Sequence, residues 1–192
     1  MNLFKIVFWA GTLMQIVIRA PFAIKARPRK KVERHVSVTE NVLLVLLTIA
    51  AGILPLIYSV THWLVPFNYY LPVWMGWLGI VILILSLLIF WRAHADLQAN
   101  WSPSLELYEE HTLITNGIYR YIRHPMYASQ LVWGIAQALL IQNWIAGFGS
   151  LIFFVPFYIL RSRAEEQMML AKFGDQYREY KKSTGGIAPK FQ

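Results

Sequence analysis

The sequence predicts an all-α fold, a polytopic bundle of about five transmembrane helices in an integral membrane protein. Of the 192 residues, 57% are hydrophobic, a larger share than in an ordinary soluble domain. The chain has no Lys, Arg, Asp or Glu from Asn41 to Trp91, and none from His124 to Leu160. Uncharged apolar runs of this length are typical of membrane spans, because a soluble fold would leave much of their surface exposed to water.

Length and residue usage narrow the classes further. A chain of 192 residues fits a single domain over residues 1–192, with spans and loops in residues 1–110 and a second region over residues 111–192. Cysteine is absent, which excludes disulfides, thiolate zinc sites and cysteine nucleophiles. The formal net charge is +8, and in a membrane protein the position of such charges reports the topology.

Residues 3–18 form the first apolar segment, which is flanked by Lys5 and Arg19. The segment is short for a full span. A secretory signal peptide is the competing interpretation, because residues 20–23 are rich in small side chains. The heavy positive charge that follows disfavours export of the next stretch.

A basic loop is expected over residues 19–40, which carry seven Lys and Arg against Glu33 and Glu40. We interpret this loop as a topology determinant that touches anionic headgroups, so membrane lipids are expected partners. Its charges from Lys25 to Arg34 are not interleaved with aromatic residues. Nucleic-acid binding is therefore not expected.

Two apolar segments follow. Residues 41–60 predict a span, with a kink at Pro55. Residues 61–72 predict a turn without charge, whose aromatic residues suit the membrane interface. Residues 73–91 are the clearest span, because a helix of this length covers roughly 28 Å, about one hydrocarbon core.

Residues 126–160 are too long for one span and predict a tight helical hairpin that turns near Gln142 and Asn143. A re-entrant pair of helices that does not cross the membrane is the alternative. Gln130 and Gln137 are seven residues apart and share a helical face, so we expect both to point away from lipid.

The tail, residues 161–192, is polar and basic. Aromatic residues spaced i, i+4 and i+7 predict an amphipathic surface helix that ends at Gly185-Gly186: Phe173, Tyr177 and Tyr180.

The charges predict which segments share a side of the membrane. Seven Lys and Arg lie in residues 19–40, three in residues 92–123 and seven in residues 161–192, together 17 of the 18 in the chain. With five spans, these three segments share one side. The positive-inside rule then places them in the cytoplasm, with the N-terminus outside and the C-terminus inside.

The most unusual stretch is residues 111–127, which hold two His, two Arg and three Tyr between apolar regions. Pro125 within it suits the first turn of a helix. We interpret the stretch as a cofactor-holding segment at the membrane surface. A second polar stretch, Arg161 to Glu166, completes a cytoplasmic cofactor pocket.

The residue types leave several roles open. If the last helix continues, Arg161 and Glu165 are i, i+4 neighbours, and they form either an intrahelical ion pair or an anion-binding arginine beside a carboxylate. His124 is either a capping and packing residue or a functional one. His111 and His124 are thirteen residues apart, which suits a metal poorly, so no metal is expected. The glycine-rich turn and βαβ pattern of a soluble nucleotide-binding sheet are absent from the sequence.

The motif Gly117-Ile-Tyr-Arg-Tyr-Ile-Arg-His-Pro-Met-Tyr127 is followed by an apolar hairpin, by Arg161-x-x-x-Glu165-Glu166 and by Phe173-Gly-Asp-Gln-Tyr-x-x-Tyr180. In order and spacing this set resembles the isoprenylcysteine carboxyl methyltransferase family, whose members are integral membrane enzymes that use S-adenosylmethionine. The resemblance covers residues 111–189. The chain looks like the short prokaryotic form with five spans, which implies a prokaryotic cell membrane.

The resemblance also implies residue roles. Arg161 matches the arginine assigned to the substrate carboxylate, the catalytic residue of this expectation. The residues that match cofactor-binding positions are His111, Thr112, Leu113, Ile114, Tyr119, His124, Pro125, Met126, Tyr127 and Glu165. A family glutamine that contacts the cofactor, seven residues before His111, is replaced by Ser104 in this chain.

The implied cofactor is S-adenosylmethionine, with S-adenosylhomocysteine as product, and the implied partner is a lipophilic, prenylated or lipid substrate. Tyrosine faces suit a sulfonium, and a carboxylate suits an ammonium or hydroxyl groups. A carboxylate substrate is already an anion near neutral pH, so its methylation needs alignment and removal of water rather than a general base. Such a substrate would enter laterally from the lipid.

Three other functions remain open. A phospholipid amine N-methyltransferase would need a base near the methyl group, with His124 as the candidate. A sterol-reductase-like enzyme would share the Arg-His-Pro-x-Tyr signature and bind NADPH, but it is expected to have more spans. A non-enzymatic basic membrane adaptor would leave residues 111–127 without a role.

Overall fold

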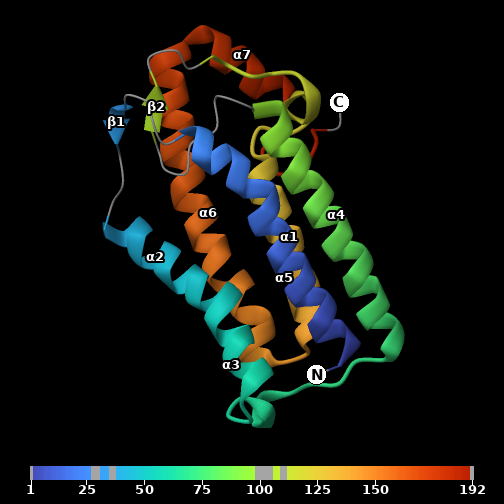
Figure 1. The fold of residues 1–192 in the computed structure, drawn as a ribbon. Coiled ribbons are helices and arrows are strands. Elements are labelled where there is room, and N and C mark those ends of the chain that lie inside the picture. The colour runs from blue at the N-terminus through green and yellow to red at the C-terminus, as the bar shows by residue number, and fades with distance from the viewer. Residues whose placement is uncertain (1, 27–30, 35–37, 98–105, 109–111, 191–192) are drawn as a thin grey trace.

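The protein is an elongated helical bundle, represented by a computed structural model that describes residues 2–26, 31–34, 38–97, 106–108 and 112–190 (Figure 1). Its main helical elements are α1 (Leu3–Ala26), a rod made of α2 (Val38–Thr48), a π-helical turn (Ile49–Ile53) and α3 (Leu54–Val60), then α4 (Val73–Leu97), α5 (Pro125–Ile141) and α6 (Trp144–Phe173). The all-α prediction is confirmed, with the addition of one small sheet.

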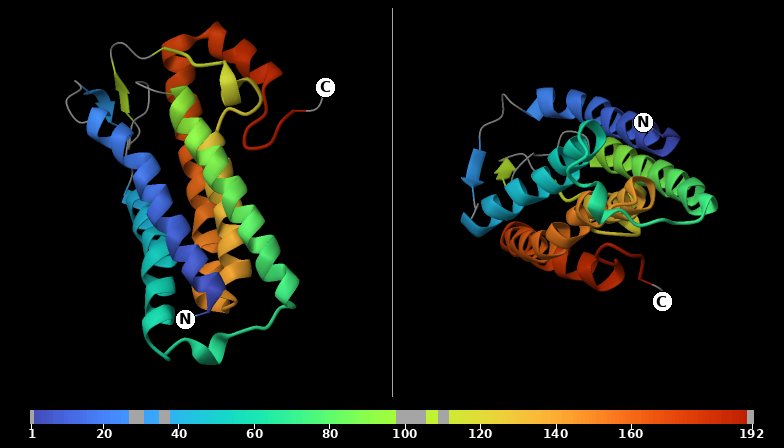
Figure 2. Two further views of the ribbon diagram at one scale, coloured as in Figure 1. Left: turned by 45° about the vertical axis from the view of Figure 1, so that its right-hand side comes forward. Right: turned by 90° about the horizontal axis from the view of Figure 1, so that it is seen from below.

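Four helical segments of the described chain are long and apolar enough to cross a membrane. They are Leu3–Lys25, Val38–Val60, Val73–Leu97 and Trp144–Phe173. Many large apolar side chains on them are exposed, as expected of lipid-facing surfaces. The fifth helix, α5, has 17 residues, about 25 Å at 1.5 Å per residue. It packs between α4 and α6 (Figure 2).

The first apolar segment is longer than predicted. We expected it to end at Ile18, but α1 continues through Arg19 and Pro21 to Ala26. The first eight of the residues assigned to the basic loop are therefore helical, because adding residues to an existing helix is easier than starting a new one. Helix α4 likewise runs past Trp91 to Leu97.

The rod formed by α2 and α3 departs from regular α-helix near the predicted kink. The π-helical turn at Ile49–Ile53 directly precedes α3, whose second residue, Pro55, is buried in its first turn. Proline lacks the N–H that a continuous α-helix requires, so the preceding turn adopts a wider hydrogen-bonding pattern.

The two predicted polar loops meet in a small antiparallel sheet. Strand β1 (Lys31–Arg34) pairs with β2 (Glu106–Tyr108). The sequence interpretation contained no strand, because segments this short in polar loops carry no readable alternation. The sheet lies at the same end of the bundle as α7 (Asp175–Ser183), opposite the loop between α3 and α4 (Figure 1). The charged segments therefore share one end.

Polar side chains stabilise the turn of the hairpin formed by α5 and α6, at the end of the bundle opposite the sheet. Helix α5 ends at Ile141, the next residue Gln142 has a left-handed φ of 50°, and Asn143 caps α6. The Asn143 side chain accepts from two backbone amides of α6 and donates to Leu64 O (2.7 Å) and Asn68 Oδ1 (2.9 Å). The predicted turn position is confirmed.

The two glutamines of α5 differ in burial. Gln137 is fully buried and donates to the carbonyls of Ala50 (3.0 Å) and Ala146 (2.7 Å). Gln130 is half-buried. The inward orientation predicted for Gln137 is confirmed, and it joins the hairpin to the π-helical turn.

The tail departs from the predicted single amphipathic helix. Phe173 is the last residue of α6. Gly174, with a φ of 53°, separates this helix from α7. Glycine adopts this left-handed conformation without a side-chain clash. Tyr177 and Tyr180 are buried on α7, so this helix packs against the protein.

Candidate functional site

The candidate site lies at the charged end of the α5–α6 hairpin. Pro125 is the first residue of α5, as predicted, and His124 directly precedes it. Helix α6 continues past the apolar run and carries Arg161, Glu165 and Glu166 beside the start of α5. The structure thus brings the two polar stretches of the sequence together.

Tyr127 joins Arg161 to Glu165. Its hydroxyl donates to Glu165 Oε1 (2.5 Å) and accepts from Arg161 Nε (2.9 Å). Arg161 Nε also lies 3.5 Å from Glu165 Oε1, the i, i+4 ion pair that was one of the two alternatives left open by the spacing. These three groups form one connected network, which fixes the orientation of the carboxylate.

Glu40 is a member of the network that the sequence interpretation missed. It lies in the first turn of α2, and its Oε1 is 2.6 Å from Arg161 Nη1. Both side chains are buried, with exposed fractions of 7% and 10%. Glu40 is the last acidic residue before the uncharged run, which is the one sequence signal that sets it apart.

His124 lies between two carboxylates. Its Nδ1 is 3.5 Å from Glu165 Oε2, and its Nε2 is 3.3 Å from Glu166 Oε1. Burial alone would lower the pKa of His124, but hydrogen bonding to Glu165 and Glu166 outweighs it, so the pKa lies above 6.5. The environment therefore favours the protonated ring.

Glu166 forms a second ionic group with Arg123 and Lys181. Its Oε1 accepts from Arg123 Nη2 (2.7 Å), and its Oε2 from Lys181 Nζ (2.5 Å). Arg123 also donates through Nη1 to the carbonyl of Thr184. The sequence interpretation assigned no role to these residues, because the contacts join segments far apart in the chain.

The chain after α7 docks on the loop that precedes α5. Arg123 N donates to Gly185 O (2.8 Å) and His124 N donates to Gly186 O (3.0 Å). A side chain at Gly185 would collide with the carbonyl of Ala188. Glycine at this position permits the close backbone approach that holds the tail against His124.

Tyr119 is buried beneath α7. Its carbonyl accepts from the Tyr180 hydroxyl (2.5 Å), and its own hydroxyl lies 3.4 Å from Ala93 O on α4. Nearby, Gly117 has a φ of 58°, and Asp96 Oδ2 accepts from Ile118 N (2.7 Å). These contacts attach the motif to both α4 and α7.

The remaining predicted cofactor residues differ in burial. Thr112 is exposed, while Leu113, Ile114 and Met126 are half-buried and Pro125 is fully buried. His111 lies outside the described residues.

Aromatic rings line this end of the hairpin. Tyr158 on α6 was not identified from the sequence, and its ring centroid lies 5.5 Å from that of Tyr127 and 6.2 Å from that of His124. Within the described residues, no group of three His, Asp or Glu is arranged to hold a metal ion. The site combines aromatic faces with carboxylates, a set that suits an organic cation.

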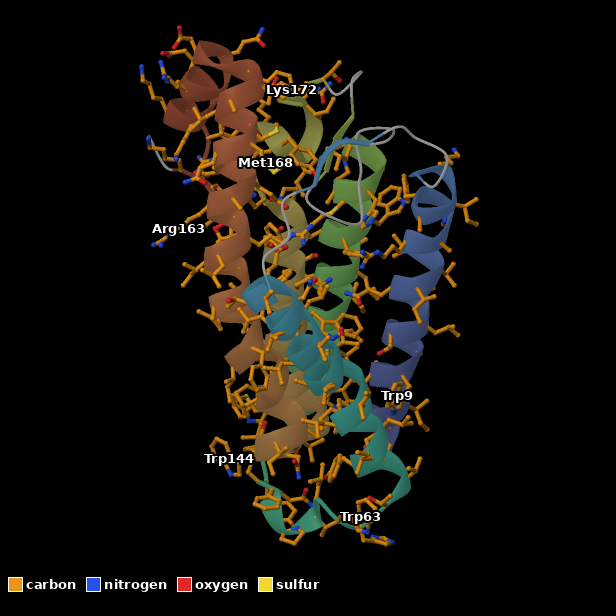
Figure 3. The ribbon with its side chains drawn as sticks, turned by 90° about the vertical axis from the view of Figure 1, so that its left-hand side faces the viewer. Trp9, Trp63, Trp144, Arg163, Met168 and Lys172 are labelled. Atoms are coloured by element: carbon orange, nitrogen blue, oxygen red, sulfur yellow. The ribbon has the colours of Figure 1, made fainter. Side chains whose placement is uncertain are left out.

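The polar end of α6 can be followed in Figure 3, where Arg163, Met168 and Lys172 are labelled on that helix, far from Trp63 and Trp144 at the opposite end. Arg163 points away from the bundle, whereas Met168 is buried. The buried face of α6 at this end is therefore the one that carries Arg161.

Known proteins match this chain over the segment that carries the site. A model of the isoprenylcysteine carboxyl methyltransferase family matches residues 77–171, which include α5 and most of α4 and α6. Protein-S-isoprenylcysteine O-methyltransferase of Dictyostelium discoideum is 32% identical over 119 residues, 60% of this chain and 49% of that protein. The human enzyme of that name is 35% identical over 74 residues, 38% of this chain and 26% of that protein.

The matches to these relatives span about half of their length or less. A solved structure of the eukaryotic intramembrane Ras methyltransferase, an isoprenylcysteine carboxyl methyltransferase, aligns with a TM-score of 0.59 at 22% identity. The alignment covers 98% of this chain and 68% of that one. At this identity the likeness establishes a shared fold.

Proposed function

Because the chain belongs to the isoprenylcysteine carboxyl methyltransferase family, we propose that it methylates the carboxylate of a lipophilic, prenylcysteine-like substrate with S-adenosylmethionine. The reaction would take place at the membrane–cytosol interface, with the C-terminus in the cytoplasm and the N-terminus outside. The observation that carries the proposal is the network of Arg161, Tyr127 and Glu165, which lies at the charged end of an integral membrane bundle.

The residues of the site fit S-adenosylmethionine by their chemistry. Tyr127 and Tyr158 offer ring faces to a sulfonium, and the partly exposed Glu165 carboxylate can accept from an ammonium or from ribose hydroxyls. The half-buried Leu113, Ile114 and Met126 supply apolar surface for an adenine. Bound there, the cofactor would supply an electrophilic methyl group.

Arg161 is the proposed contact for the substrate carboxylate. Its guanidinium is nearly buried, so its attraction for an anion is weakly screened by water. Tyr127 and Glu165 hold Nε in a fixed direction. The role of the protein is then to align a nucleophile that is already charged and to keep water from it.

The surroundings of His124 favour carboxylate methylation over amine methylation. Methylation of an amine needs a group that takes up a proton. His124 lies between Glu165 and Glu166, and these carboxylates raise its pKa, so the ring tends to keep its proton. Both ring nitrogens already face a carboxylate, so neither is directed toward an amine as the proton acceptor.

The charge of the site disfavours NADPH. Three carboxylates, Glu40, Glu165 and Glu166, converge with the cations of the network. A dinucleotide phosphate carries several negative charges, so these carboxylates would repel it more strongly than a substrate with a single carboxylate.

Calorimetric titration of the detergent-solubilised protein tests the proposal, with S-adenosylhomocysteine in one cell and NADPH in another. We expect binding of the first alone, followed by methyl transfer to a farnesylated cysteine in a labelled-methyl assay. Binding of NADPH alone would assign the protein to the reductases. If a folded sample bound neither ligand, the result would favour the adaptor function.

A further inference from the structure

The hydrogen-bond donors of Arg161 are divided between two sides of its guanidinium. Nη1 donates to Glu40 from α2, and Nε donates to Tyr127 from α5. Among the hydrogen bonds of Arg161 to described residues, none uses Nη2. The planar guanidinium has a rigid set of five N–H donors. Contacts at Nε and Nη1 therefore fix the direction in which the Nη2 donors point.

Glu40 also changes the charge around Arg161. Its carboxylate is 2.6 Å from Nη1, and the Glu165 carboxylate is 3.5 Å from Nε. Two carboxylates beside one guanidinium reduce its attraction for a third. An unopposed buried arginine would instead bind a substrate carboxylate tightly in the ground state, which lowers KM without helping the reaction.

We propose that Glu40 is a positioning residue that directs Nη2 of Arg161 toward the substrate carboxylate. Glu40 also weakens the binding of that carboxylate by Arg161. The inference rests on the proposed function. It assigns α2, a helix outside the segment matched by the family model, a direct part in setting how the acceptor is held. Glu40 acts through Arg161 and need not touch the reacting atoms.

The proposal makes opposite predictions for ground-state binding and turnover. Glu40→Gln keeps the shape and an oxygen acceptor for Nη1 but removes the negative charge. We expect KM for a farnesylated cysteine to stay level or fall, and kcat to drop about tenfold through misalignment and overbinding. Affinity for S-adenosylhomocysteine should remain within about twofold of wild type, because Glu165 is unchanged.

A matched ligand pair isolates the effect of charge. The probes are the farnesylated cysteine and its carboxamide, each measured as a competitor of turnover or by direct titration. Glu40→Gln should raise the preference for the carboxylate over the carboxamide. Glu40→Asp keeps the charge, and we expect it to retain the wild-type preference with a smaller loss of kcat. Glu179→Gln, on the exposed surface of α7, serves as the control.

Each outcome decides one question. Wild-type kcat, KM and ligand preference in Glu40→Gln would overturn the inference and leave the proposed function standing. Joint loss of S-adenosylhomocysteine binding and turnover would show that Glu40 serves the fold, which also overturns it. A wild-type protein that binds S-adenosylhomocysteine but methylates no carboxylate would overturn the proposed acceptor and this inference with it.

Discussion

At the residue scale, the site is a chain of polar contacts between groups that are each poorly suited to burial alone. Arg161, Tyr127 and Glu165 satisfy one another within 2.5–3.5 Å. A buried charge without such partners would be strongly unfavourable. Substitutions in this network should therefore affect ligand binding through the orientation of their neighbours as well as directly.

Glu165→Gln tests the proposed cofactor contact with little change of shape. We expect affinity for S-adenosylhomocysteine to fall by about 10- to 100-fold, because a charge-assisted hydrogen bond becomes a neutral one. Calorimetric titration measures the change. Glu179→Gln is the control, since Glu179 is exposed and pairs with Lys182. Unchanged affinity in Glu165→Gln would remove Glu165 from the cofactor site.

The pH dependence of stability reports on His124. Burial alone would lower its pKa, but the favourable contacts with Glu165 and Glu166 exceed that effect and raise the pKa in the folded protein above its usual value of 6.5. A raised folded pKa means that the stabilisation is complete below 6.5 and is lost as pH rises through the folded pKa. We expect the Tm difference between wild type and His124→Asn to shrink as the pH rises through the folded pKa of His124. A difference that grows with pH would contradict this.

At the element scale, the hairpin positions the network. Helices α5 and α6 turn tightly at Gln142 and Asn143 and remain in contact along their length. That alignment places Tyr127 beside Arg161 and Glu165, although these residues are 34 and 38 positions apart. The distant end of the hairpin therefore contributes to the geometry of the site.

Asn143→Ala should loosen the hairpin at its turn. The substitution removes the cap of α6 and the hydrogen bonds to Leu64 and Asn68. We expect a loss of about 1–3 kcal/mol of stability, because the substitution leaves buried groups without partners. Thermal unfolding in detergent measures it. Asn116→Ala is the control, since Asn116 is exposed and its side chain caps no helix. Equal Tm values in the two variants would refute the role of Asn143.

At the scale of the whole molecule, the charged segments gather at one end and the uncharged loop between α3 and α4 lies at the other (Figure 1). The small sheet of β1 and β2 ties two of these segments together. This arrangement agrees with the distribution of Lys and Arg along the sequence. By the positive-inside rule, we expect the charged end to face the cytoplasm.

The absence of cysteine from the chain allows a direct test of orientation. We expect His62→Cys, in the exposed loop after α3, to react with a membrane-impermeant maleimide added outside intact cells. Arg178→Cys, at an exposed position on α7, should react only after the membrane is permeabilised. Wild type provides the unlabelled background. The reverse pattern would invert the proposed topology.

The sequence by itself determined the helical membrane fold, the hairpin turn, and the placement of Arg161 and Glu165 as neighbours on one helix. These features follow from local quantities: runs of apolar residues, a four-residue spacing on one helix and a polar turn between two spans. The extended α1 and the break at Gly174 were not predicted, since helix ends depend on small local preferences.

Only the tertiary structure decided which distant residues complete the site. Glu40 meets Arg161 across 121 positions, and Gly185 and Gly186 hold the backbone of Arg123 and His124. No periodicity in a sequence encodes such contacts. They arise because helix packing brings charges together in a weakly polar interior, where each buried cation requires a nearby anion from whichever element can supply it.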